Sequence, residues 1–148
     1  MTIELLKKSQ LFQTLNVKEA NLLGSICRLE KFKAGSTIIE ENTNGRALFI
    51  IKSGEVKVCK IDEKGKETSI GMLSAGEHFG EMALIEDQRT SARIVADSDV
   101  ELLSISRPDL VKLLENNPEL AAKVYYSICK TLSERLRRAD TYILLLSQ

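Results

Sequence analysis

The sequence predicts a mainly-β domain with flanking helices, built as an eight-stranded jelly-roll β-barrel. Glycines in the middle of the chain recur every 9 to 11 residues, and the segments between them are rich in β-branched and aromatic residues. Both ends of the chain instead carry apolar residues at helical spacing. A length of 148 residues suits one domain. We expect N-terminal helices in 1–28, the barrel in 29–106 and C-terminal helices in 107–148.

The N-terminal region is predicted to form two short helices, at 3–8 and 18–28. In the second, apolar residues lie at the spacing of one helix face: Leu22, Leu23, Ile26 and Leu29.

The central region is predicted to form short strands joined by tight turns. Segments 42–45, 52–54 and 62–66 contain Gly, Asn or Asp, which tolerate positive φ, and they read as hairpin ends. Residues 55–58, between the second and the third of these turns, alternate between polar and apolar side chains, as a half-buried strand does. Two more strands are expected at 91–96 and 100–106, after an interruption near 80–88.

The C-terminal region is predicted to contain two helices. Ser106 is the expected N-cap of the first, with Pro108 in its first turn, and this helix covers 109–115. Asn117 is the expected cap of the second, which has Pro118 at its first position and continues close to the end of the chain.

Apolar residues repeat along this last helix at intervals of four and three, which is a coiled-coil pattern. They are Tyr125, Cys129, Leu132, Leu136, Ala139, Ile143 and Leu146. The first half of this helix is expected to pack on the barrel. Beyond Leu136 a domain of this size has no surface left to cover the helix, so we expect it to pair with a second copy, as a homodimer.

Composition limits the possible functions. The hydrophobic fraction of 43% with 28% charged residues is that of a packed globular protein, and the net charge is zero. Without a net positive field, non-specific binding to DNA or to an acidic membrane is not expected. The longest apolar run, 143–146, is far below the roughly 20 residues of a membrane span. No signal peptide is evident at the N-terminus, so we expect a cytoplasmic protein.

The sequence offers few residues that could serve in catalysis or bind a metal. The three cysteines are far apart in the sequence and are expected to be buried free thiols rather than zinc ligands or disulfides. His78 is the single histidine, which disfavours hydrolytic triads and multi-histidine metal sites. His78 itself is expected to face solvent. An enzyme, a cofactor and a metal are therefore not expected.

The segment that interrupts the strand pattern is the candidate binding site. Gly80 precedes a short helix-forming run, and a helix start with a glycine favours a phosphate. Glu81 would repel that phosphate, so it is better explained as an acceptor for a neutral donor such as a sugar hydroxyl. Phosphate and hydroxyl together indicate a nucleotide. The alternative is structural: Glu81 complements the helix dipole and Gly80 ends a strand.

The run 79–84, Phe-Gly-Glu-Met-Ala-Leu, followed by Ser91 and Ala92, resembles the phosphate-binding cassette of the cyclic-nucleotide-binding domain family. That family includes bacterial catabolite activator proteins, protein kinase A regulatory subunits and cyclic-nucleotide-gated channels. Further matches are the turn at 32–35, the segments 44–51 and 53–58, and the start of the last helix at 117–120. The resemblance implies a jelly roll with a cassette at 79–92.

The resemblance also implies roles for individual residues. Gly80, Met82 and Ala83 match backbone contacts to the cyclic phosphate, Glu81 matches the carboxylate that holds the ribose 2′-hydroxyl, and Ser91 matches a phosphate contact. Val58, Ile70 and Leu73 match apolar residues of the pocket, and Arg135 falls where the terminal helix covers the base.

One position departs from the family pattern. The family has an arginine directly before the Ser-Ala pair, where this chain has Thr90, and Arg89 stands one place earlier. A charge-assisted bond to phosphate contributes about 1.5 to 3 kcal/mol. Arg89 could occupy the phosphate site if Thr90 is looped out, whereas Arg93 is expected to point elsewhere.

Two functions follow as hypotheses. The first is a regulatory domain that binds cAMP or cGMP and signals through its C-terminal helix to an unknown downstream protein. The second is a degenerate cyclic-nucleotide-binding fold that serves as a dimerisation or protein-interaction scaffold, which Thr90 favours. Because no helix-turn-helix segment follows the last helix, DNA binding by this chain is not expected.

Overall fold

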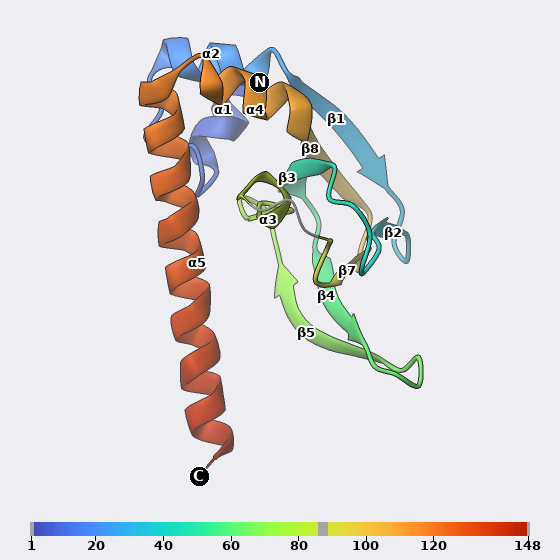
Figure 1. The fold of residues 1–148 in the computed structure, drawn as a ribbon. Helices are drawn as coiled ribbons and strands as arrows, with labels where there is room; N and C mark the ends of the chain where they lie inside the picture. The colour runs from blue at the N-terminus through green and yellow to red at the C-terminus, as the bar shows by residue number, and fades with distance from the viewer. Residues whose placement is uncertain (1, 86–88, 148) are drawn as a thin grey trace.

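The computed structural model describes residues 2–85 and 89–147 and consists of a β-roll with helices along one side (Figure 1). The helices are α1 (Thr2–Lys8), α2 (Val17–Gly24), α3 (Met82–Ile85), α4 (Arg107–Glu115) and α5 (Pro118–Leu146). The strands are β1 (Cys27–Phe32), β2 (Thr37–Ile39), β3 (Ala47–Ser53), β4 (Val56–Ile61), β5 (Glu67–Leu73), β6 (His78–Phe79), β7 (Arg93–Ala96) and β8 (Val100–Ser106).

The strands form two antiparallel four-stranded sheets, in the orders β1-β8-β3-β6 and β2-β7-β4-β5. This confirms the jelly-roll prediction and corrects its detail, because the sheets are not closed into a barrel. The edge strand β6 has only two residues, which pair with Phe49 and Ile50 of β3. No ladder among the described residues joins β6 to β5, or β1 to β2, so the two sheets stay separate.

Strand β3 is buried on both faces and divides the core into two clusters. Leu48 and Ile50 face a cluster shared with the helices, and Phe49 and Ile51 face a cluster between the sheets. Because successive side chains of a strand point to opposite faces, one continuous apolar run serves both clusters. β8 contributes to both clusters in the same way.

The second N-terminal helix is shorter than expected. It ends at Gly24 rather than near residue 28, and residues from Cys27 onward form β1, where Cys27 pairs with Ile105 of β8. The helical spacing of Ile26 and Leu29 was therefore misleading, because pairing with a central strand outweighs a weak local preference. The helix begins with a capping box between Asn16 and Glu19.

The C-terminal helices begin where the sequence predicts, but one cap differs. Ser106 caps α4 by accepting a hydrogen bond from the Asp109 amide at 3.3 Å, although the helix already starts at Arg107. The Asn117 side chain does not cap α5. It donates instead to the Leu113 carbonyl at 2.8 Å, so it closes α4.

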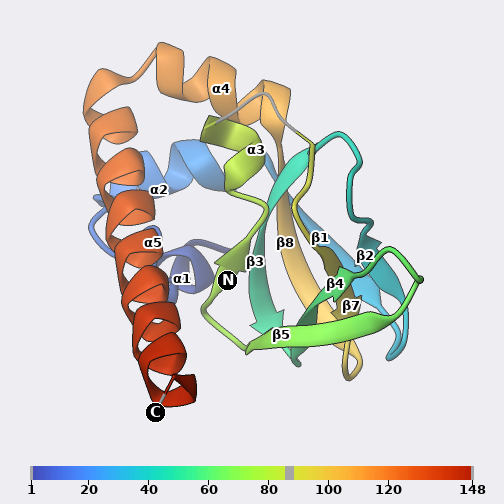
Figure 2. The ribbon, with the colours of Figure 1, turned by 60° about the horizontal axis from the view of Figure 1, so that its bottom comes forward.

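Helix α5 is a 29-residue rod beside the β-roll, and its C-terminal end stands clear of the rest of the molecule (Figures 1 and 2). Its buried stripe comprises Leu120, Val124, Ser127, Ile128 and Thr131. The described part of the chain contains no helix long and apolar enough to cross a membrane.

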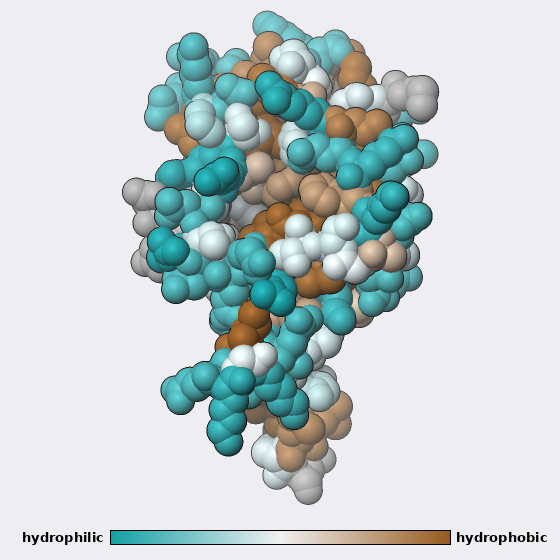
Figure 3. Space-filling view, turned by 90° about the vertical axis from the view of Figure 1, so that its right-hand side faces the viewer, coloured by the Kyte–Doolittle hydropathy of each residue, from teal (hydrophilic) through white to brown (hydrophobic). Residues whose placement is uncertain are grey.

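The heptad residues of α5 lie mostly outside that buried stripe. Tyr125 and Cys129 are exposed, so the expectation that the first half of the seam packs on the roll is wrong for these two. The physical reason is that the roll covers the helix through the stripe of Leu120 and Ile128, and only Leu132 of the seam is half-buried beside it. The projecting end of α5 carries apolar side chains (Figure 3).

Candidate functional site

A cavity of about 800 Å³ opens between the β-roll and α5. Its lining contains nine of the eleven residues that the sequence singles out: Val58, Leu73, Gly80, Glu81, Met82, Arg89, Thr90, Ser91 and Arg135. The topology collects them from two strands, the cassette and the terminal helix. The side chain of Ala83 lies outside the described part of the structure, as do residues 86–88 of the cassette.

Ile70 does not line the cavity, which corrects the expectation for this residue. Its side chain is 59% exposed. The register between β4 and β5 shifts between Val58 and Cys59, so that Ile70 has no direct partner on β4. Alternation from Leu73, which lines the cavity, also places Ile70 on the other face of β5.

The apolar floor of the cavity includes residues that sequence reasoning missed. The rings of Phe49 and Phe79 stack with their centroids 5.0 Å apart, and both line the cavity together with Ala47. Alternation along β3 puts Ala47 and Phe49 on one face, which is the signal that could have identified them. A stacked aromatic pair gives the cavity a flat apolar wall of the kind that small-molecule sites use.

Gly80 has a positive φ of 86° and lies against the β3 backbone. A Cβ at this position would lie 2.5 Å from the Ala47 carbonyl oxygen. Both the backbone conformation and the close approach therefore require glycine. The close neighbour in the structure is protein backbone, which fixes the direction in which the chain enters α3 and so places Glu81.

Glu81 is buried and is held by two elements. The Arg135 guanidinium donates to Glu81 Oε1 at 2.6 Å and to the His78 carbonyl oxygen at 2.6 Å, so α5 is linked both to β6 and to the turn after it. Burial raises the pKa of Glu81, but the His78 imidazole and the Arg135 guanidinium outweigh it and hold the pKa below its usual value. Glu81 is therefore an ionised acceptor at neutral pH.

His78 is fully buried, which corrects the expectation that it faces solvent. It pairs with Ile50 of β3, and its side chain shares the face of Ile50, which belongs to the core cluster beside the helices. Its Nδ1 lies 3.6 Å from Glu81 Oε1, too far for a hydrogen bond but close enough for electrostatic attraction.

Thr90 joins the end of the cassette to the loop before β3. Its hydroxyl accepts from the Thr43 amide at 2.9 Å and donates to the Glu40 carbonyl at 2.5 Å, and its own amide donates to the Thr43 carbonyl at 2.7 Å. Thr90 is thus held in place rather than looped out. The Thr90 hydroxyl therefore has a structural role, because it joins the cassette to the loop before β3. It stands at the position where the resemblance to the family implies an arginine.

Arg89 lies at the rim of the cavity and is exposed. Its Nε donates to the carbonyl and side-chain oxygens of Asn42, at 2.8 and 2.9 Å. These acceptors are neutral, so they orient the guanidinium without cancelling its charge. Arg93 behaves as expected: it lies outside the cavity lining and pairs with Glu40 at 2.8 Å and with Glu67 at 3.3 Å.

Among the described residues, the charges around the cavity leave a positive excess at its rim. Glu81 is paired with Arg135, and Glu40 is paired with Arg93. Arg46 and Arg89 also line the cavity, and neither forms an ion pair with any residue of 2–85 or 89–147. An apolar cavity with one buried carboxylate and two unneutralised guanidinium groups fits a ligand that has hydroxyl groups, a flat apolar part and a negative charge.

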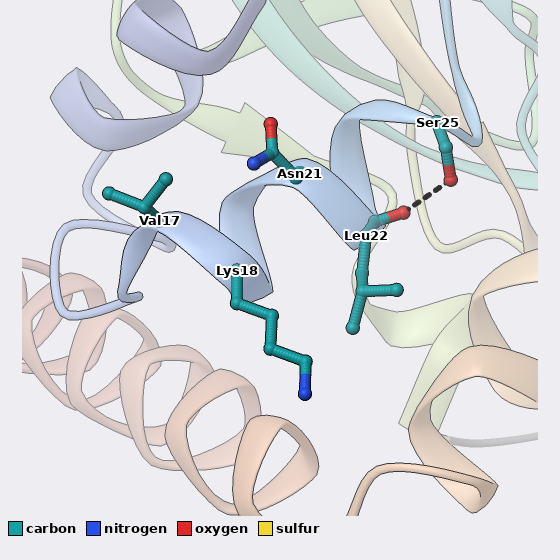
Figure 4. A pocket seen from close by; sticks show the side chains of 5 residues that line it. All are labelled: Val17, Lys18, Asn21, Leu22 and Ser25. Atoms are coloured by element: carbon teal, nitrogen blue, oxygen red, sulfur yellow. Dashed lines mark hydrogen bonds between the residues drawn. The ribbon is translucent and has the colours of Figure 1, made fainter.

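A second hollow lies on the surface of α2 (Figure 4). It is lined by Val17, Lys18, Asn21, Leu22 and Ser25. The Ser25 hydroxyl donates a hydrogen bond to the Leu22 carbonyl at 2.6 Å, so it is not free for a ligand. All of these residues come from one helix and the turn after it. In this hollow, polar groups from different elements do not point toward one place, as they do in the larger cavity.

The cysteines differ in burial. Cys59 is buried and Cys27 half-buried, and burial raises the pKa of each thiol to about 11. Cys129 is exposed on α5, so the expectation of three buried thiols is wrong for this one. It stands between the buried residues Ile128 and Thr131 but on an exposed face of α5.

Comparison with known proteins agrees with this geometry. A model of the cyclic nucleotide-binding domain matches residues 29–117. The cyclic AMP receptor protein of Thermus thermophilus is 34% identical over 142 residues, which are 96% of this chain and 64% of the receptor. The chain thus spans less than two thirds of that relative.

Solved structures give the same result. A cyclic nucleotide-binding domain from Methylobacillus flagellatus is 29% identical and superposes with a TM-score of 0.85 over 97% of this chain and 80% of that one. The regulatory domain of Toxoplasma gondii PKA, crystallised with cAMP, is 27% identical with a TM-score of 0.70 over 76% of this chain and 42% of that one. These domains are regulatory rather than catalytic, which confirms the prediction that this domain is not an enzyme. The chain belongs to the cyclic nucleotide-binding domain family.

Proposed function

We propose that the chain binds a cyclic nucleotide, cAMP or cGMP, in the cavity between the β-roll and α5, and that α5 passes the occupancy of the cavity to a partner protein. The observation that carries this proposal is the position of Glu81, a buried and ionised carboxylate that lines the cavity and is bonded to Arg135 of α5. The ribose 2′-hydroxyl would donate to Glu81. The phosphate would lie toward the guanidinium groups of Arg89 and Arg46, which form no ion pair with the described residues.

Signalling follows from the double role of Arg135. This side chain lines the cavity and also connects α5 to the cassette through Glu81 and the His78 carbonyl. A ligand shifts a conformational equilibrium only through contacts that differ between the two states. A nucleotide that shares Glu81 with Arg135 changes the contacts that hold α5, so helix position and occupancy become coupled.

We further propose that α5 pairs with a second copy of the chain. The seam residues Leu136 and Ile143 are 63% and 62% exposed, on the part of the helix that projects from the roll. Two α5 helices paired in register would bury the seam residues of both copies against each other. The scaffold alternative uses the same pairing without a ligand, and the structural use of the Thr90 hydroxyl is the observation that favours it.

Calorimetric titration with cAMP and with cGMP tests the binding proposal. We expect saturable binding of at least one of them, and a weaker affinity for its 2′-deoxy analogue by roughly 10- to 150-fold, the range of a hydrogen bond to a charged group. In the variant Glu81→Gln, the cyclic nucleotide and its 2′-deoxy analogue are expected to bind with more nearly equal affinity, because the hydroxyl has lost its charged partner.

The matched control is Glu19→Gln, which removes another buried carboxylate that is paired with α5 but does not line the cavity. It should retain the preference for the 2′-hydroxyl. Absence of binding to both nucleotides in the folded wild-type protein would contradict the proposal and favour the scaffold function.

A further inference from the structure

The buried imidazole of His78 is a titratable group that the proposed binding mode does not yet use. The side chain is fully buried, and neither ring nitrogen has a hydrogen-bond partner within the described residues. Buried polar groups normally have hydrogen-bond partners, because burying one without a partner is unfavourable. An apolar residue at this position would avoid that cost. The presence of an imidazole here therefore suggests that its ability to carry a proton has a function.

Among the described residues, His78 interacts with two charged side chains: Glu81, whose Oε1 lies 3.6 Å from Nδ1, and Arg135, which donates to the His78 carbonyl oxygen. Its partner on β3 is the apolar Ile50. Glu81 Oε1 is the atom that both the imidazole and the guanidinium face.

The net charge of this cluster depends on the imidazole. With neutral His78, the charges of Glu81 and Arg135 cancel. A protonated His78 leaves one buried positive charge, which is unfavourable in the empty site. A cyclic phosphate adds one negative charge close to the cassette, and it therefore favours the protonated imidazole.

We propose that His78 is a positioning residue for Glu81, and that it takes up a proton when an anionic cyclic nucleotide enters the cavity. By linkage, the affinity for the nucleotide then rises as the pH falls through the range in which the imidazole titrates. The inference rests on the proposed function, because the negative charge is that of the nucleotide. Glu81 stays ionised through this range, since its pKa is held below the usual value.

The free protein tests the contact between His78 and Glu81 without any ligand. Because the chain has a single histidine, its imidazole proton signals in NMR spectra follow one group. We expect Glu81→Gln to lower the midpoint of that titration by about 0.5 pH unit or more, because the imidazolium loses its negative neighbour. Glu19→Gln is the control and should not move the midpoint. An unchanged midpoint in Glu81→Gln overturns the inference.

The nucleotide tests the proton uptake. Titration calorimetry with cAMP and cGMP between pH 5.5 and 8, in two buffers of different ionisation enthalpy, measures the protons taken up. Wild type is expected to take up part of one proton and to bind more tightly at lower pH, by at most tenfold per pH unit. His78→Phe should bind with no such dependence, and His78→Gln serves if the phenylalanine variant does not fold.

The outcomes separate the two proposals. A flat pH profile in wild type, or the same slope in wild type and His78→Phe, overturns the role of His78 while nucleotide binding stands. No binding of either nucleotide at any pH overturns the proposed function, and proton coupling to the nucleotide falls with it. The titration of the free protein still decides whether His78 and Glu81 interact.

Discussion

At the scale of single residues, the cassette gives two different roles to two neighbouring residues, Arg89 and Thr90. Thr90 occupies the arginine position and joins the cassette to the loop at Thr43 through its hydroxyl and its backbone. Arg89, one residue earlier, carries the positive charge and is oriented by the neutral oxygens of Asn42. The position of the charge along the chain has changed, but a guanidinium still lines the cavity.

Arg89→Ala is expected to weaken cyclic-nucleotide binding about 10-fold or more, because the phosphate loses a charge-assisted partner. The loss should be larger at low salt, since the guanidinium is exposed and its interaction is screened. Calorimetry at two salt concentrations measures both effects. Arg93→Ala is the control, because Arg93 is paired with Glu40 and Glu67 outside the cavity lining. An equal loss in both variants would mean that Arg89 has no specific role.

At the scale of elements, α5 serves two surfaces with different residues. The stripe of Leu120, Val124 and Ile128 fastens its first half to the roll. The heptad seam lies beside that stripe and continues along the projecting half, where Leu136 and Ile143 have no cover within the described chain. The two patterns share Leu132, which is half-buried and lines the cavity.

Replacing Leu136 and Ile143 together by glutamate is expected to convert a dimer into a monomer, raising the dissociation constant at least about 100-fold, because apolar burial is lost and like charges meet. Light scattering coupled to size exclusion gives the mass. The fold should persist, since both side chains are exposed in the single chain. Glutamates at Leu144 and Leu145, equally exposed but off the heptad seam, should leave the mass of wild type. A monomeric wild type would disprove the pairing.

At the scale of the whole molecule, buried carboxylates tie the helices to one another and to the roll. Glu81 connects the roll to α5 through Arg135, and Glu19 connects α2 to α5 through Lys123 at 2.6 Å. Burial raises the pKa of Glu19, but the hydrogen bonds from Lys123 and the Asn16 amide outweigh it and hold the pKa below its usual value. A lowered pKa in the folded state means that the ionised form stabilises the fold.

This contribution is present above the ordinary glutamate pKa of about 4.5 and is lost as the pH falls through the lower folded-state value. Glu19→Gln is therefore expected to reduce the free energy of unfolding by roughly 1–2 kcal/mol at pH 7. The difference from wild type should shrink as the pH falls below 4.5, because the carboxyl group of Glu19 becomes protonated and then carries no charge, like the glutamine amide. Urea denaturation at a series of pH values measures it, with Glu63→Gln in the exposed β4–β5 turn as the control. A difference independent of pH would exclude the ion pair as its cause.

Local patterns in the sequence were sufficient for the mainly-β centre, the turns and the Ser106 cap. Together with the resemblance to the family, they also gave nine of the residues that line the cavity. They succeed because alternation, positive-φ glycines and capping residues depend on near neighbours along the chain. Gly80 and Glu81 were identified for the same reason, since a short motif sets their backbone.

Other features depended on contacts between distant segments, and only the tertiary structure decided them. Cys27 became part of a strand because it pairs with Ile105 of β8. His78 is buried because β6 places it against Ile50 of β3, and Arg135 reaches Glu81 across 54 positions of the chain. Periodicity carries no information about which distant surface will cover a residue, so burial, register and the partners of a charge follow from packing alone.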